Sequence, residues 1–148
     1  MPRPTPENVP PVFAPHLQPG EQLRYFAYGV KQPNILLILV LVCLAVLPGL
    51  IATAILTKHF LIGLTDKRLL VLRIASMGNH GVKEVLEYPL GSLTPAQVKT
   101  STGALFTHIR IDDPAKPFVA KFHRLGMKTN RDHSMAIAAA ISSRALPA

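Results

Sequence analysis

The chain has 148 residues, of which 49% are hydrophobic, and a formal net charge of +8 at neutral pH. This length fits one small domain and leaves little room for a deep substrate cleft. The only cysteine, Cys43, excludes disulfides and cysteine-based metal sites. Residues 58 to 148 hold 13 Lys and Arg against 6 Asp and Glu, whereas residues 1 to 57 hold 3 against 2, so the C-terminal part is the basic part.

The N-terminal segment is rich in proline. Residues 1 to 19 contain seven of the 14 prolines, so no helical or strand pattern runs through them uninterrupted. This composition predicts a disordered or polyproline-like tail over residues 1 to 19. The next unit, residues 20 to 33, is predicted to be an N-terminal strand, because residues 23 to 30 have the aromatic content of a short strand.

Residues 34 to 57 are predicted to be a hydrophobic membrane segment. Residues 35 to 56 carry no charge and are interrupted only by Pro48, Gly49 and Thr53. As one helix they would cover about 33 Å, the thickness of a bilayer core. As a helical hairpin with its hinge at Pro48 and Gly49, each arm would be too short to span. We favour the hairpin, because it alone leaves the N-terminal strand on the same side as the rest of the domain.

Basic residues flank this segment unequally. More cations follow it than precede it, namely Lys58, Lys67, Arg68 and Arg73 against Arg24 and Lys31. By the positive-inside rule, this asymmetry places the C-terminal domain in the cytoplasm.

Residues 58 to 146 are predicted to form one domain, which begins with short strands. Two apolar runs, residues 60 to 64 and 69 to 74, have the spacing of a β-hairpin. Residues 106 to 111 and 118 to 123 alternate between two faces, as half-buried strands do. One face of these two strands carries Thr107, Ile109 and Ile111, and then Phe118, Ala120 and Phe122.

The last predicted element is a helix, which Thr129 or Asn130 can cap and in which Asp132 lies in the first turn. Ile137 and Ile141 share one of its faces. Consecutive strands followed by one amphipathic helix predict a mainly β fold. In this fold, a curved antiparallel sheet or small barrel is covered at one open end by a C-terminal α-helix.

Two short motifs flank the apolar segment. Residues 17 to 21 read LQPGE, and residues 60 to 71 read FLIGLTDKRLLV. With residues 90 to 98 and 104 to 111 in the places of two later strands, the chain resembles the bacterial pleckstrin-homology-like (PH-like) domain proteins. The resemblance covers about residues 17 to 143.

The resemblance implies a curved, PH-like barrel with a C-terminal helix. It also implies a location beside the membrane and frequent oligomers. Together with the charge asymmetry, the expected location is the bacterial inner membrane, with the PH-like domain in the cytoplasm. Relatives commonly carry two membrane helices between the two motifs, whereas this chain has room for only one segment of membrane length. The shared motifs are structural, and none is a catalytic signature.

One basic stretch has the chemistry of a binding site. Residues 114 to 131 contain five cations and no carboxylate. Near an anionic leaflet each cation contributes about 1 kcal/mol, so five that face the same way would attract a headgroup strongly. The alternative is a solvated face on which they point in different directions. The candidate residues for binding a lipid headgroup or a partner are Lys116, Lys121, Arg124, Lys128 and Arg131.

The function that we expect is a non-enzymatic, membrane-anchored module that binds lipid headgroups or a protein partner. The alternative is a structural subunit whose hydrophobic segment packs against copies of itself in a homo-oligomer. No catalytic residue, metal ligand or cofactor is predicted, because the six histidines lack ligand spacing and no nucleophile motif occurs. Nucleic acid is not expected as a partner, since the chain has no Trp and no stacking motif.

Overall fold

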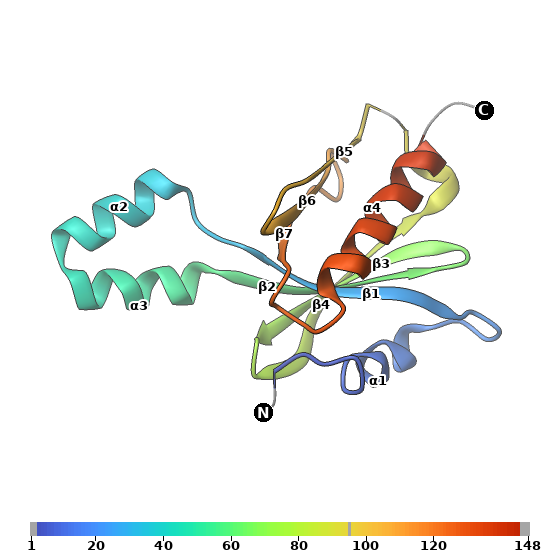
Figure 1. Ribbon diagram of the computed structural model, residues 1–148, viewed down its shortest axis with the longest axis horizontal. Helices are drawn as coiled ribbons and strands as arrows, with labels where there is room; N and C mark the ends of the chain where they lie inside the picture. Colours follow the sequence, from blue (N-terminus) through green and yellow to red (C-terminus); the bar gives the residue numbers. More distant parts are fainter. Residues whose placement is uncertain (1–2, 95, 146–148) are drawn as a thin grey trace.

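The computed structural model of the chain describes residues 3 to 94 and 96 to 145. Seven strands form one antiparallel sheet in the order β4-β3-β2-β1-β7-β6-β5 (Figure 1). The strands are β1 (Leu23–Lys31), β2 (Lys58–Thr65), β3 (Arg68–Ser76), β4 (Asn79–Pro89), β5 (Val98–Thr102), β6 (Phe106–Ile111) and β7 (Phe118–His123).

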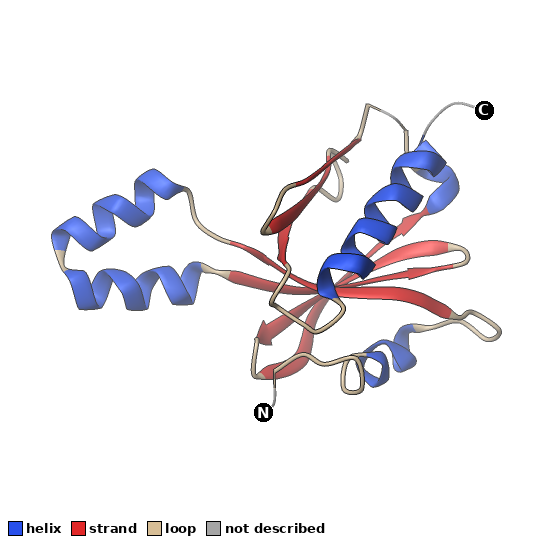
Figure 2. Cartoon of the chain, viewed as in Figure 1, coloured by secondary structure: helices blue, strands red, loops and turns tan. Residues whose placement is uncertain are grey.

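The helices lie outside the sheet (Figure 2). They are α1 (Pro10–Phe13), η1 (Ala14–His16), α2 (Ile35–Leu44), α3 (Val46–Leu56), η2 (Leu90–Ser92) and α4 (Asn130–Ala145). The sheet is curved, and α4 lies across it. The predicted mainly β fold, with a curved antiparallel sheet and a C-terminal α-helix, is therefore confirmed. The predicted domain end at residue 146 lies outside the described residues.

The inner face of the sheet packs against α4. The alternation predicted for β6 and β7 is confirmed, because Ile109, Ile111 and Phe118 are buried in one cluster with Ile137 and Ile141 of the helix. Fully burying an Ile or Phe side chain contributes roughly 1.5–3 kcal/mol. This cluster therefore holds the helix on the sheet.

The start of α4 is fixed to β1 by a side chain. Asn130 Oδ1 accepts a hydrogen bond from Tyr28 N at 2.7 Å, and its Nδ2 donates to Tyr28 O at 2.8 Å. The amide is therefore used between elements and not as the predicted helix cap. Thr129, the other predicted cap, keeps a buried Oγ1 without a hydrogen-bond partner among the described residues.

The outer face of β1, β2 and β3 is covered by the N-terminal segment. Val9 and Phe13 are completely buried there, in a second cluster with Leu61, Leu70 and Leu72. The disordered tail predicted for residues 1 to 19 is therefore wrong for the turns of α1 and η1. Pro10 occupies the first position of α1, where a missing N–H costs no hydrogen bond. Residues 1 and 2 lie outside the described residues.

The apolar segment forms a helical hairpin, made of α2 and α3, that projects from the sheet (Figure 1). The hinge predicted at Pro48 and Gly49 lies instead at Ala45, which is extended with φ −162°. The reason is local, since Pro48 has no N–H to bond to the carbonyl of Leu44 and its ring would clash with that carbonyl. Within the described part of the chain, no helix has both the length and the apolar character needed to cross a membrane.

Gly49 has a different role from the predicted one. It is buried where α3 meets α2, and a Cβ atom added to it would collide with the carbonyl oxygen of Leu41 and lie 2.8 Å from Val42 N. Only glycine therefore allows the two helices to approach this closely. The hinge and the close contact are separate features of the hairpin.

β1 lies in the middle of the sheet and not in a separate unit. It pairs with β2 from Leu23 to Lys31 and touches β7 through Val30 and Lys121. A single membrane crossing between β1 and β2 would separate these strands, so the pairing requires the chain to fold back. Within the predicted unit of residues 20 to 33, the strand is β1 (Leu23–Lys31), and it belongs to the same sheet as the strands that follow residue 58.

Candidate functional site

The hairpin leaves the sheet between two lysines that face each other. Lys31 ends β1, Lys58 begins β2, and the two residues are paired in register. Both are exposed. Like charges directly opposite each other in a sheet are destabilising, by up to about 1 kcal/mol. The pair therefore does not serve the stability of the sheet, and it gives the base of the hairpin a positive charge.

A hollow of about 260 Å³ opens beside this lysine pair. Phe60 and Phe118, which belong to the core beneath α4, also line it, so it opens on the inner face of the sheet. We call it the inner mouth. Four cations against one carboxylate make it suited to an anion. Its charged residues are Lys31, Lys58, Arg73, Lys116 and Glu84.

The cations of the inner mouth are only partly satisfied by the protein. Lys116 Nζ donates to Glu87 O at 2.6 Å and lies 5.5 Å from the ring centroid of Tyr88. Arg73 Nη1 lies 3.9 Å from Glu84 Oε2, an exposed and weak ion pair. Lys31 and Lys58 form no ion pair with any described residue. Two of the four charges are therefore available to a ligand.

The five cations predicted as a binding set do not share one hollow. Lys116 lines the inner mouth, whereas Lys121 lines two hollows on the outer face. Arg131 donates two hydrogen bonds, of 2.9 and 3.2 Å, to carbonyl oxygens in the loop between β5 and β6. Arg124 and Lys128 are exposed in the segment between β7 and α4. The structure thus brings only Lys116 to the inner mouth.

From the sequence alone, Lys31, Lys58 and Arg73 are predicted only as charges that flank the apolar segment. A signal for the first two was present, because an apolar segment that folds back between two paired strands places its flanking residues opposite each other. Arg73 carries no such signal. It reaches the inner mouth because β3 pairs with β2 in a register that sets it opposite Phe60.

The motifs that carry the family resemblance meet in a buried ion-pair cluster. Arg68 Nε and Nη2 donate to the Glu21 carboxylate at 2.9 to 3.3 Å, and Thr65 Oγ1 donates to it at 2.8 Å. The hydrogen bonds from Arg68 lower the pKa of Glu21 to about 2, although its side chain is fully buried. Gly20 has a φ of 80°, which glycine adopts without strain. The LQPGE motif is therefore structural.

A second polar contact joins β1 and β2 near the hairpin. Tyr28 Oη and His59 Nδ1 are 2.5 Å apart, and their rings are stacked. Burial raises the pKa of Tyr28 to about 12 and lowers the pKa of His59. At neutral pH the phenol therefore stays protonated and donates to a neutral imidazole. This pair fixes the outer side of the strand ends from which the hairpin projects.

The histidines do not gather into a cluster. His108 and His123 lie on neighbouring strands with Phe106 close to both, at ring-centroid distances of 6.0 and 4.9 Å. Among the described residues, no three His, Cys, Asp or Glu side chains are placed to hold a metal ion.

Comparisons with known proteins bear on the fold of this chain. No protein-family model matches the sequence, and no curated protein matches it. Among solved structures, the chain is similar to the hSac2 domain from the human phosphoinositide phosphatase Sac2, with a TM-score of 0.50 and 11% sequence identity. The likeness covers 95% of this chain and 84% of that chain. At this identity it shows the fold alone, namely a mainly β domain with a C-terminal helix.

Proposed function

We propose that this chain is a non-enzymatic module of the bacterial PH-like type. Its hairpin enters one leaflet of the bacterial inner membrane, and its inner mouth binds anionic lipid headgroups at the cytoplasmic face. One observation carries the proposal. An uncharged, exposed helical hairpin projects from between Lys31 and Lys58, so an apolar element and a cluster of cations lie next to each other.

The apolar surface of the hairpin supports membrane anchoring. Twelve of its large apolar side chains are between 44% and 78% exposed. Burying the exposed part of each in lipid would gain about 1 kcal/mol, or on the order of 10 kcal/mol in total. The cations at the base contribute about 1 kcal/mol each near an anionic surface. The hairpin is therefore the anchor, and the cations set the orientation and the choice of lipid.

The threonine hydroxyls of α3 and its C-terminal end are also compatible with lipid. Thr53 Oγ1 donates to Gly49 O at 2.9 Å, and Thr57 Oγ1 donates to Thr53 O at 2.8 Å. At the start of α2, Asn34 Oδ1 accepts from Leu36 N at 2.8 Å. A polar group placed in lipid has to be satisfied inside the protein, and the two threonine hydroxyls meet that requirement.

The lengths of the helices favour insertion into one leaflet. Each arm has 10 or 11 residues and covers about 15 Å, half the thickness of a bilayer core. Both ends of the hairpin return to the same sheet, so the whole domain stays on one side. The basic residues at these ends favour the cytoplasmic side.

The test is membrane fractionation of the full chain, expressed in bacteria, with washes in high salt and in carbonate. We expect the chain to stay in the membrane pellet, because the apolar contribution is not screened by salt. A variant with residues 32 to 57 replaced by Asn-Gly is the control and should be soluble. Recovery of the intact full chain as a large soluble homo-oligomer would overturn the proposal and favour the structural subunit.

A further inference from the structure

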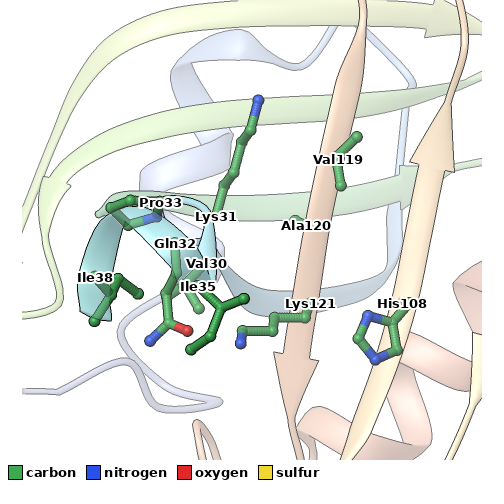
Figure 3. Close-up of a pocket in the computed structure, with 10 residues that line it drawn as sticks. All are labelled: Val30, Lys31, Gln32, Pro33, Ile35, Ile38, His108, Val119, Ala120 and Lys121. Atoms are coloured by element: carbon green, nitrogen blue, oxygen red, sulfur yellow. The ribbon is translucent and has the colours of Figure 1, made fainter. Parts of the chain in front are cut away.

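Two apolar hollows adjoin each other on the outer face of the sheet, at the base of the hairpin. The near hollow, of about 320 Å³, lies between the start of α2 and β7 (Figure 3). The far hollow has about 330 Å³ and lies beside it. Both volumes reach the lower end of the range of ligand pockets, roughly 300–1,000 Å³. Because Val30, Gln32 and Lys121 line both hollows, the two form one continuous surface.

The apolar residues trace a path away from the hairpin. Ile35 and Ile38 of α2 line the near hollow. The far hollow is lined by large apolar and aromatic side chains, among them Tyr28, Met77 and Leu125. Leu125 is 74% exposed and forms part of this apolar lining. An acyl chain that entered beside α2 could therefore continue into the far hollow.

Lys121 stands between the two hollows. Its side chain extends from β7 across the near hollow toward Ile35 and Gln32, whereas Lys31 points the other way (Figure 3). Its ammonium lies 5.0 Å from the ring centroid of Phe106 and forms no ion pair with any described residue. Among the described residues that line the two hollows there is no carboxylate. The charge of this surface is therefore complementary to an anion.

His123 adds a second donor to the far hollow, which it lines. Leu125 N donates to His123 Nδ1 at 3.1 Å, so Nδ1 is the acceptor nitrogen of the ring. The proton of the neutral imidazole then sits on Nε2, which is a donor. One ammonium and one imidazole N–H suit the oxygens of a carboxylate or a phosphate.

From this arrangement we infer that the two hollows bind one molecule of an anionic single-chain amphiphile. Its carboxylate or phosphate binds Lys121 and His123, its acyl chain lies against the apolar side chains of the far hollow, and the near hollow is its path from the membrane. The inference rests on the proposed function, because the hairpin has to bring the hollows to the membrane. It adds a lipid site on the opposite face of the sheet from the inner mouth, which the near hollow adjoins through Lys31 and Val119.

The experiment is photolabelling of the full chain in nanodiscs of phosphatidylcholine. The probe is a twelve-carbon fatty acid with a diazirine at the end of its chain, and the labelled residues are mapped by mass spectrometry. We expect label on Met77, Leu125 or Tyr28. Dodecanoate and dodecyl phosphate should compete, and the stronger competitor identifies the headgroup. Inorganic phosphate and dodecyltrimethylammonium should not compete, because one lacks the chain and the other carries the wrong charge.

Variants separate binding from simple partition into the disc. Lys121→Gln should lower labelling of the far hollow about tenfold, since a hydrogen bond to a charged group is lost, and Lys121→Arg should restore it. Lys128→Gln is the matched control, an exposed cation outside both hollows, and should change nothing.

The outcomes distinguish this inference from the proposed function. If the chain stays with the disc but label is confined to residues 35 to 56, the amphiphile site is refuted and the membrane anchor stands. Labelling that Lys121→Gln does not change, or that the cationic amphiphile blocks equally well, would also refute the site. Failure of the full chain to remain with the disc would instead defeat the proposed function.

Discussion

Lys31 and Lys58 are cross-strand neighbours, although 26 residues lie between them in the sequence. The chain thus leaves the sheet and returns to it at the same point. The hairpin is in effect a long turn between β1 and β2, and both strands are complete without it. This relationship makes the proposed anchor separable from the fold, and it also explains why both flanking lysines lie at the inner mouth.

The first prediction is that the hairpin can be removed without loss of the fold. Replacing residues 32 to 57 by Asn-Gly should join β1 to β2 by a two-residue turn, which suits paired antiparallel strands. We expect a soluble monomer with the circular dichroism of a β-rich domain and a cooperative thermal transition. As a control, a fragment of residues 58 to 148 lacks the central β1 and should not fold. An unfolded replacement variant would show that the hairpin belongs to the core.

The second prediction concerns the N-terminal segment with α1 and η1, which packs on the outer face of the sheet. Phe13 is completely buried, so Phe13→Ala should lower the free energy of unfolding by about 3–5 kcal/mol, measured by chemical denaturation in mild detergent. Glu7→Ala, at an exposed position of the same segment, is the matched control and should have little effect. Equal stability of the two variants would mean that the segment is a free tail.

The third prediction is an acid dependence that comes from Glu21. Its pKa falls from 4.5 to about 2 in the folded protein, so folding favours the ionised carboxylate. The resulting stability is complete above about pH 4.5 and is lost as the pH falls toward 2. We expect Glu21→Gln to be less stable at neutral pH and to lose less stability on acidification. If denaturation curves of the variant and the natural chain declined in parallel below pH 4.5, the cluster would not be responsible.

The fourth prediction separates charge from anchoring. Changing Lys31 and Lys58 together to Gln should leave the thermal stability unchanged or slightly raised, because a like-charge pair is removed. The same double variant should lose its preference for vesicles with phosphatidylglycerol over pure phosphatidylcholine in flotation assays, yet still float with both. Lys83→Gln, an exposed cation of β4, serves as the control. An unchanged preference would mean that the inner mouth does not select lipids.

The sequence predicts the parts of the fold that depend on local pattern. Period-two alternation in residues 106 to 111 and 118 to 123 correctly assigns their inner faces, because one side of each strand packs against α4. The fold-back of the apolar segment is also predictable, since only a fold-back leaves the N-terminal strand on the same side as the rest of the domain. The position of the hinge at Ala45 is not predicted. The reason is that Pro48 ends the preceding helix several residues before the proline itself.

The packing of residues 9 to 13 on the sheet does not follow from their proline content, because it depends on the strands that they cover. β2 and β3 are continuous apolar runs, buried on both faces. Such runs indicate strands that are buried on both faces. They therefore predict that a second segment, besides the final helix, packs on the sheet. The inner mouth was missed for another reason. Its cations come from β1, β2, β3 and the loop before β7, which are distant in sequence, whereas the predicted set followed one continuous stretch.

The central claim is that the hairpin lies within lipid, and the chain provides its own reporter. Cys43 is its only cysteine and is exposed in the last turn of α2, next to the tip of the hairpin. A fluorophore sensitive to polarity can be attached there, in full-length protein reconstituted into phosphatidylcholine vesicles with phosphatidylglycerol. A second sample, with Cys43→Ser and Asp66→Cys, places the label in the β2–β3 turn at the far end of the sheet. We predict that the label at Cys43 shifts to shorter emission wavelength and is quenched by lipids carrying a nitroxide on the acyl chain, but not by aqueous iodide, with the reverse at position 66. Iodide quenching at Cys43 without nitroxide quenching would contradict the account.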